Sequence, residues 1–273
     1  MQPTIVIKIG GGKGIDLATI AREFSELVRS GVRAVLVHGG SHETDTLATQ
    51  LDHPPQTITS PSGHTSRRTD RKTLEIFMMA YCGRINKSLV EQLRSLGVDA
   101  VGLSGIDGGI WTASRKDAIR AIENGRTVII RDDLTGKVES VDATLLNLLL
   151  DNGRVPILTP PAVTRDGTAV NVDADRAAAA TAAALRADEL LLLSNVPGVL
   201  RHPDDPASLI SRADDLEVLR SAARGRMKNK VLAAEEAIAG GVGRVIIGSA
   251  LGESAIARAR SGQGTVLEGA ATS

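Results

Sequence analysis

The stretch Thr4–Ile9, with the sequence TIVIKI, and the glycines Gly10, Gly11 and Gly12 that follow it decide the fold class. The β-branched run predicts a buried strand, and the glycines predict a sharp turn after it. Lys8 is unusual, because an ammonium group among apolar strand residues is costly to bury without a partner. Glycine N–H groups can approach an anion, so the segment favours a phosphate site. The alternative is a plain turn beside a lysine that reaches solvent.

The order of strand, glycine turn and helix recurs along the chain. Buried strands are predicted at residues 34–37, 100–103, 155–158, 189–194 and 245–247, of which the last is the final clear strand. Short strands are predicted at 127–131 and 136–139, around a turn at Thr135 and Gly136. Helices are predicted at residues 17–30, 43–50, 70–96 (with a break near Gly83), 145–152, 176–186 and 227–239. Apolar strands that alternate with helices are typical of a parallel sheet covered on both faces. We therefore expect one α/β domain over residues 1–273, a three-layer αβα sandwich with a mainly parallel central sheet.

Composition excludes several functional classes. The hydrophobic fraction of 42% is enough for a large core, whereas the aromatic fraction of 1% argues against binding of single-stranded nucleic acid. The 32 basic residues balance 32 acidic residues, so no net field attracts nucleic acid or a membrane surface. Cys82 is the single cysteine, which we interpret as a small buried hydrophobe in a reducing cytoplasm. Without a signal pattern or a long apolar run, we expect a soluble cytoplasmic protein.

A second glycine turn, formed by Gly39, Gly40 and Ser41, follows the next predicted strand. Open α/β sheets bind ligands where parallel strands end, so two such turns favour an anionic ligand. We interpret His38, before the turn, as a polar capping residue rather than a catalytic base. Residues 56–65 are polar, with Gly63 near their centre, and predict a loop or exposed hairpin.

Three further segments carry charges at the starts of predicted helices. Asp70 resembles an N-cap that is flanked by Arg67, Arg68, Arg71 and Lys72. Cations in a first helical turn oppose the helix dipole, which suggests an anionic ligand, although a solvated helix start remains open for Arg71 and Lys72.

The second and third of these segments lie in the C-terminal half. Asn171 and Asp175 precede an alanine-rich helix, where Asp175 is either an N-cap or a side chain directed at the strand ends. Lys228 and Lys230 follow Gly225 in the first turn of another helix, again against the dipole.

Taken in order, these segments resemble the motifs of the amino-acid kinase family, in particular its acetylglutamate kinase branch. The resemblance covers nearly the whole chain and rests on five patterns: Lys8-x-Gly-Gly, His38-Gly39-Gly40, Arg67-x-Thr69-Asp70, Asn171-x-Asp173-x-Asp175 and Gly225-x-Met227-x-x-Lys230. It implies an ATP-dependent kinase that phosphorylates a carboxylate. It also implies an amino-acid lobe up to about residue 170 and an ATP lobe over about 171–273.

The resemblance implies a role for each matching residue. Lys8 would contact the transferred phosphoryl group, Lys230 the nucleotide phosphates, and Asp175 both lysines. The substrate would be bound by Gly39, Gly40, Ser41, Arg67 and Asn171, and the ATP phosphates by Gly10, Gly11, Gly12, Ser194, Asn195 and Gly198. A Mg²⁺ ion would be held by ATP phosphates and water, with no ligand from protein side chains.

Ser41 departs from the branch, whose members usually read His-Gly-Gly-Gly. The surrounding run is similar to aminoadipate kinases of bacterial lysine biosynthesis, which act on aminoadipate linked through its amino group to LysW, a small acidic carrier protein. A docking patch is expected from Arg68, Arg71, Lys72, Arg84 and Lys87, with residues 56–65 as hairpin and lid, unless these cations form a solvated helix face.

Two alternative functions remain open, and one oligomeric state is expected. The alternatives are N-acetylglutamate kinase of arginine biosynthesis, or an enzyme that also uses carrier-linked glutamate, and a non-catalytic sensor with the same fold. Because the chain starts on its first strand, the resemblance implies a homodimer without arginine feedback. The apolar run Ile76, Phe77, Met78 and Met79 is compatible with that interface.

Overall fold

The computed structural model describes residues 2–61, 65–123, 125–212 and 216–269. Its centre is a seven-stranded sheet in the order β15-β14-β13-β1-β2-β10-β5, in which every pairing is parallel except that of edge strand β15. The strands of this sheet are β1 Thr4–Ile9, β2 Arg33–His38, β5 Ala100–Ser104, β10 Val155–Thr159, β13 Glu189–Ser194, β14 Arg244–Ser249 and β15 Thr265–Glu268. The expected α/β class with a mainly parallel sheet is confirmed.

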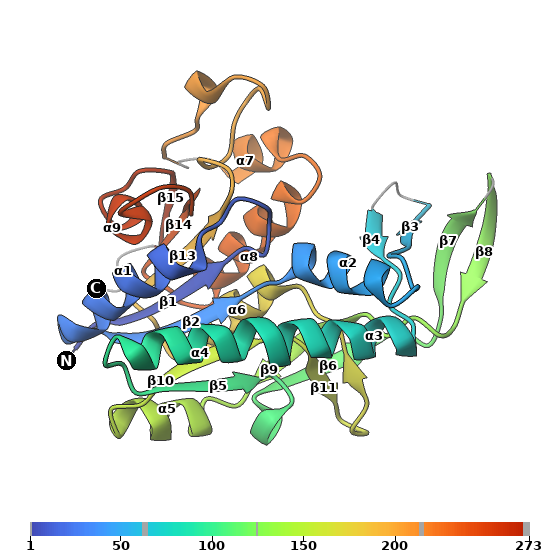
Figure 1. Ribbon diagram of the computed structural model, residues 1–273. Coiled ribbons are helices and arrows are strands. Elements are labelled where there is room, and N and C mark those ends of the chain that lie inside the picture. Colours follow the sequence, from blue (N-terminus) through green and yellow to red (C-terminus); the bar gives the residue numbers. More distant parts are fainter. Residues whose placement is uncertain (1, 62–64, 124, 213–215, 270–273) are drawn as a thin grey trace.

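Helices cover both faces of this sheet, as Figure 1 shows. They are α1 Leu17–Arg29, α2 Ser41–Gln50, α3 Arg71–Met78, α4 Asn86–Ser95, α5 Thr144–Asp151, α6 Ala174–Ala184, α7 Leu216–Ala222, α8 Met227–Ala239 and α9 Ala255–Arg260. Helices α1, α4 and α9 pack on one face, and α5, α6, α7 and α8 pack on the other. Side chains of β1 alternate between the two, because successive strand residues point to opposite faces.

Small sheets lie beside the central sheet, and most of their strands were not predicted. A four-stranded sheet, β12-β11-β6-β9, contains β6 Trp111–Arg115, β9 Gly136–Val141, β11 Ala162–Thr164 and β12 Ala169–Val170. Two hairpins, β3 Thr57–Thr59 with β4 Thr65–Arg67 and β7 Ile119–Glu123 with β8 Arg126–Ile130, extend from one end of the molecule (Figure 1). Ile58, Ala121 and Ile130 form the apolar contact between them. The hairpin predicted at residues 56–65 is therefore present, although its Gly63 lies outside the described residues.

The predicted long helix is also present, and where a break was expected near Gly83 it continues as a π-helical segment. Helix α3 passes into a π-helical segment, Met79–Ile85, and then into α4. Asp70 caps α3 by accepting a hydrogen bond from the Thr73 backbone N–H at 2.7 Å, as predicted. Ile76 and Phe77 belong to the chain's own core, and only Met79 is half exposed. The apolar run expected at a dimer interface is thus largely used inside the chain.

Two sequence-based predictions about strands were wrong. The strands predicted at 127–131 and 136–139 exist but do not face each other across a turn, because β8 pairs with β7 and β9 pairs with β6. Strand β14 is not the last strand, since the short edge strand β15 follows it.

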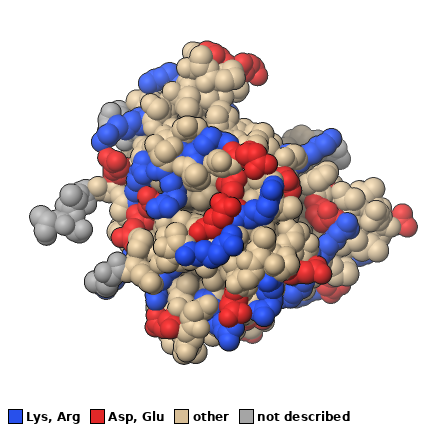
Figure 2. Space-filling view, turned by 60° about the vertical axis from the view of Figure 1, so that its left-hand side comes forward, with Lys and Arg blue, Asp and Glu red and all other residues tan. Residues whose placement is uncertain are grey.

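In Figure 2, basic and acidic side chains are interspersed over the face shown, in keeping with the neutral composition.

Candidate active site

The carboxyl ends of β1, β2 and β13 meet at one edge of the sheet. Ile9 pairs with His38 on one side and with Leu193 on the other, so the turns after these strands are neighbours. The turns after β1 and β2 touch through their backbones, because a Cβ atom on Gly11 would lie 2.2 Å from the backbone nitrogen of Gly40. Only glycine allows this approach, and it leaves backbone groups rather than side chains facing the edge.

A cavity of about 680 Å³ opens at this edge. Thirteen residues singled out from the sequence line it: Lys8, Gly10, Gly11, Gly12, Gly39, Ser41, Arg67, Asn171, Asp175, Ser194, Asn195, Gly198 and Lys230. Gly40 is not among the lining residues, because it packs under the side chains of Tyr81 and Ile85. The predicted patch residues Arg68, Arg71, Lys72, Arg84 and Lys87 also lie outside the lining.

Lys8 is buried, 6% exposed, and its charge has a partner. Lys8 lies two residues after Val6 in β1, so the two side chains point to the same face of the sheet. Val6 packs there in the cluster that contains residues of α6 and α8. Its Nζ lies 2.7 Å from Oδ1 of Asp175, and Nζ of Lys230 lies 2.9 Å from Oδ2 of the same carboxylate. One carboxylate therefore holds two lysine ammonium groups at the same end of the cavity.

The electrostatics of this trio follow from its burial. Burial alone would raise the pKa of Asp175, but the ammonium groups of Lys8 and Lys230 outweigh it and hold that pKa well below its ordinary value. Burial lowers the pKa of Lys230, and the charge of Lys8 adds to this effect, whereas Asp175 opposes it. The arrangement carries a net positive charge, which suits an anionic ligand.

Asp173, rather than Asp175, is the N-cap of α6. Its Oδ1 accepts hydrogen bonds from the backbone N–H groups of Asp175 and Arg176, at 2.9 and 3.0 Å. Its Oδ2 accepts a hydrogen bond from Nδ2 of Asn229 on α8 at 2.8 Å. The N-cap alternative for Asp175 is wrong, because Asp173 has that role and leaves Asp175 free to bind the lysines. Sequence reasoning assigned no role to Asp173 or Asn229, although Asp173 lies within a quoted motif.

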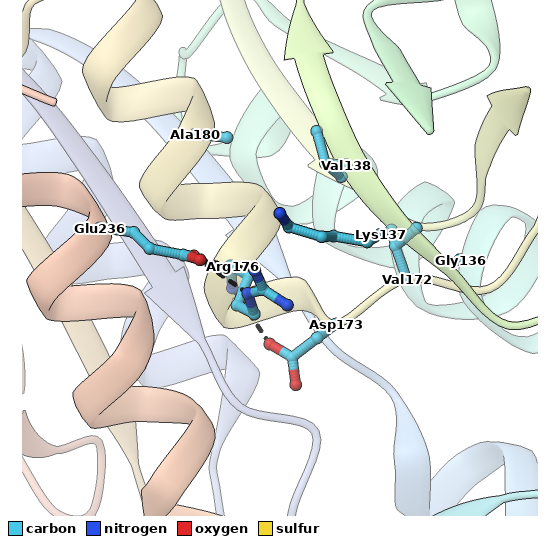
Figure 3. A pocket seen from close by; sticks show the side chains of 8 residues that line it. All are labelled: Gly136, Lys137, Val138, Val172, Asp173, Arg176, Ala180 and Glu236. Atoms are coloured by element: carbon cyan, nitrogen blue, oxygen red, sulfur yellow. Dashed lines mark hydrogen bonds and ion pairs between the residues drawn. The ribbon is translucent and has the colours of Figure 1, made fainter. Parts of the chain in front are cut away.

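A second contact joins the same two helices around a smaller cavity of about 210 Å³ (Figure 3). The guanidinium of Arg176 on α6 donates two hydrogen bonds to the carboxylate of Glu236 on α8, at 2.9 and 2.5 Å. These bonds raise the pKa of Arg176. With the Asp173–Asn229 contact, this pair fixes the positions of Asp175 and Lys230 relative to each other.

The other end of the main cavity is formed by the β3–β4 hairpin and its neighbours. Nη1 of Arg67 lies 2.5 Å from Oδ1 of Asp45 on α2. Asn171 donates a hydrogen bond to Oγ1 of Thr69 at 3.3 Å. Phe77 and Tyr81 also line the cavity, with their rings stacked 3.8 Å apart. Neither was expected at the cavity, because apolar residues at helical spacing look like core, and Phe77 was expected at a dimer interface instead.

A third wall follows β13 and contains Ser194, Asn195 and Gly198. Within the described residues, the buried Oγ of Ser194 has no hydrogen-bond partner, so a ligand group can satisfy it. Gly198 has a φ of +154°, and a Cβ atom there would lie 2.7 Å from the side chain of Leu209. This wall is therefore backbone-rich, like the two glycine turns.

The interpretation of His38 as a capping residue was wrong. Helix α2 begins without a side-chain cap, and His38 is buried with Nε2 3.1 Å from Nδ2 of Asn86. Nδ1 lies 3.0 Å from the carbonyl oxygen of Gly39. Burial lowers the pKa of His38 to about 4, so the ring is neutral at pH 7. Cys82, expected to be a small buried hydrophobe, is only partly buried, and this burial raises the pKa of its thiol to about 11.

The predicted basic patch is divided by its ion pairs. Arg84 pairs with Glu43 at 2.7 Å and Arg68 with Asp132 at 3.0 Å, while Lys87 donates to the carbonyl oxygen of Gly102. Arg71 and Lys72 are exposed and have no ion-pair partner in the part of the chain that the structure describes. These two residues are the cations most available to a partner.

Two features are absent from the described residues, a cluster of metal ligands and a membrane-spanning helix. No group of three or more His, Cys, Asp and Glu side chains there is arranged to hold a metal ion. None of the helices within those residues combines the length and apolarity needed to cross a bilayer.

Comparisons with known proteins agree with this geometry. The family model described as "Amino acid kinase family" matches residues 3–249. The "[LysW]-aminoadipate kinase" of Deinococcus radiodurans is 55% identical over 96% of this chain and 91% of its own length, and that of Thermus thermophilus is 48% identical over 96% and 99%. Carbamate kinase from Giardia lamblia, at 16% identity and a TM-score of 0.69, covers 98% of this chain and 99% of its own and shares the fold. The chain belongs to the amino acid kinase family.

Proposed function

We propose that this protein transfers the γ-phosphoryl group of ATP to the side-chain carboxylate of 2-aminoadipate linked to a small acidic carrier protein of the LysW type, in lysine biosynthesis. The observation that carries the proposal is the shared cavity, which has the Lys8–Asp175–Lys230 trio at one end and Arg67 and Asn171 at the other. The two relatives at 55% and 48% identity support this choice of substrate.

The chemistry needs positive charge and alignment rather than a base. A substrate carboxylate is ionised at neutral pH, so its oxygen attacks phosphorus directly while the bond to the ADP oxygen breaks. Lys8 would stabilise the transferred phosphoryl group and Lys230 the oxygens on the leaving side. The carboxylate of Asp175 holds the two ammonium groups in place. The N–H groups of Gly11 and Gly12 would bind phosphate oxygens, whereas the N–H of Gly10 lines up the turn by donating to the Leu193 carbonyl oxygen at 2.8 Å.

The remaining assignments divide the cavity between two ligands. Residues up to about 170 would form the amino-acid lobe, with Gly39, Ser41, Arg67 and Asn171 at the substrate, and residues from about 171 the ATP lobe. Gly40 would support this subsite from below, since it packs under Tyr81 and Ile85 and does not line the cavity. Mg²⁺ would offset phosphate charge while held by phosphate oxygens and water, and the site offers it no cluster of protein ligands in the described residues. Arg71 and Lys72 would attract the acidic carrier. We also propose that the protein is a homodimer and works in the cytoplasm.

The test traps the acyl phosphate with hydroxylamine in three parallel reactions, which contain carrier-linked aminoadipate, carrier-linked glutamate or free N-acetylglutamate. We expect carrier-linked aminoadipate to react fastest. The Lys8→Ala variant is the control for contaminating kinases, because it should abolish phosphoryl transfer by this protein while its fold remains intact. Turnover of free N-acetylglutamate alone would assign the protein to arginine biosynthesis, and wild-type activity in Lys8→Ala would refute the mechanism. ATP binding without turnover of any carboxylate would indicate a sensor.

A further inference from the structure

Asp133 is a buried carboxylate, 3% exposed, that the mechanism above does not use. Its Oδ2 accepts a hydrogen bond from the Thr69 backbone N–H at 3.0 Å, and its Oδ1 accepts one from the Thr135 backbone N–H at 2.9 Å. Among the described residues it forms no ion pair within 4 Å. A carboxylate is costly to bury, so these two bonds must offset a substantial desolvation penalty.

Both N–H groups belong to segments that line the amino-acid end of the cavity. Thr69 comes two residues after Arg67, and its Oγ1 donates to the Arg67 carbonyl oxygen at 3.3 Å. The same Oγ1 accepts the hydrogen bond from Nδ2 of Asn171. Thr135 forms a bridge with Asn171, so Asp133 is connected to Asn171 from two sides.

The backbone completes this connection. The N–H of Asn171 donates to the Leu134 carbonyl oxygen at 2.8 Å, and the N–H of Gly136 donates to the Asn171 carbonyl oxygen at 2.8 Å. Arg115 supports the turn from the opposite side, because its Nε donates to the Asp133 carbonyl oxygen at 2.7 Å. Segments that are far apart in the sequence are thus held together at one carboxylate.

We propose that Asp133 is a positioning residue, which sets the geometry of Arg67 and Asn171 in the amino-acid subsite through Thr69. This inference rests on the proposed function, since it concerns how the substrate is bound. An asparagine at position 133 has one acceptor oxygen where two N–H groups need acceptors, so either Thr69 or Thr135 loses its partner. Displacement of Thr69 then moves both substrate-binding side chains, while the Lys8–Asp175–Lys230 trio keeps its own contacts.

The experiment measures KM for ATP and KM for carrier-linked aminoadipate separately in Asp133→Asn. We expect KM for the amino-acid substrate to rise about tenfold or more, with KM for ATP within about twofold of wild type. The matched control is Asp142→Asn, because Asp142 also accepts a backbone hydrogen bond, from Thr144 at 2.9 Å, but at an exposed helix start. We expect the control to keep both KM values.

A second pair of variants keeps the test decisive if Asp133→Asn does not fold. Thr69→Val removes the acceptor for Asn171 with little change in shape and should raise the same KM, and Thr69→Ser should restore it. Equal increases in both KM values, or an unchanged amino-acid KM in Thr69→Val, would overturn the positioning role. Failure of wild-type protein to phosphorylate any of the three carboxylates would instead refute the proposed function.

Discussion

The two ends of the cavity hold cations in different ways. The proposed phosphate end contains the Lys8–Asp175–Lys230 trio, and the proposed amino-acid end contains Arg67 and Asn171. At the phosphate end, Lys8 and Lys230 are 6% and 7% exposed, and both bind one buried carboxylate. At the amino-acid end, Arg67 pairs with Asp45, and outside the lining the largely exposed Arg84 pairs with Glu43. Charges at the phosphate end come from a central strand and two packed helices, whereas Arg67 lies on a three-residue strand.

This difference separates a fixed site from an exchangeable one. The cations of a buried trio cannot find other partners, so the phosphate end is organised before ATP arrives. The Arg84–Glu43 pair is the more exposed one, and exposed ion pairs are worth little, so an acidic carrier can replace Glu43. The Arg67–Asp45 pair is partly buried, so only a carboxylate that enters the cavity can take the place of Asp45. We therefore expect substitutions at the phosphate end to change kcat and those at the other end to change KM.

The largest effect is expected for Asp175→Asn, which tests whether the trio is one unit. Two buried ammonium groups would lose their shared counterion, so kcat should fall about 1000-fold and the free energy of unfolding by about 3 kcal/mol. Single-turnover kinetics and urea unfolding measure the two effects. Asp166→Asn, in an exposed turn, is the control. A kcat within tenfold of wild type would show that the two ends do not differ as described.

The next prediction concerns the effect of acidification on stability, which depends on the burial of His38 at the end of β2. The pKa of His38 is lowered to about 4 by burial, so the unfolded chain binds a proton between pH 6.5 and 4 that the folded chain does not. The free energy of unfolding should therefore decrease by about 3 kcal/mol as pH falls through this range. The lowered pKa of Asp175 adds a further loss only below about pH 4, where its carboxylate becomes protonated in the unfolded chain.

Urea unfolding at several pH values measures this slope. His38→Gln should flatten it, and His202→Gln, at an exposed position, should leave it unchanged. Equal slopes in wild type and His38→Gln would mean that the protonation of His38 is not what destabilises the fold.

Arg67→Lys sharpens the comparison at the amino-acid end. A lysine keeps the charge but loses the planar, two-pronged geometry that matches a carboxylate. KM for the carrier-linked substrate should rise about tenfold while kcat and KM for ATP change little. Steady-state kinetics with each substrate varied in turn provides the measurement. Arg94→Lys, which alters an exposed pair with Asp99, is the matched control. A dominant change in KM for ATP would contradict the division of the cavity.

The smallest effect is expected outside the cavity, for Arg71→Ala combined with Lys72→Ala. These exposed cations would act through long-range attraction, so KM for the carrier-linked substrate should rise about threefold at low salt. The difference should disappear near 1 M salt, where charges are screened over about 3 Å. Lys116→Ala, at another exposed position, serves as the control. A threefold increase that persists at high salt would argue against electrostatic docking.

Local patterns in the sequence predicted much of this molecule. Strand β13 and helix α8 match their predicted bounds, because an apolar run or an amphipathic helix expresses preferences of its own residues. The sequence also singled out thirteen of the residues that line the cavity, fewer than half of the lining. The small sheet containing β6 and β9 was not predicted, since its short strands are stabilised by partners distant in the sequence.

What the sequence determined by itself is therefore the alternation of strands, glycine turns and helices, and the presence of Lys8 at the end of the first strand. Only the tertiary structure decided which charges meet. It assigned the helix cap to Asp173 and freed Asp175 for two lysines, and it divided the basic patch by pairing Arg84 with Glu43. The physical reason is that strand and helix preferences act over a few residues, whereas ion pairs depend on which chain segments folding brings within 4 Å.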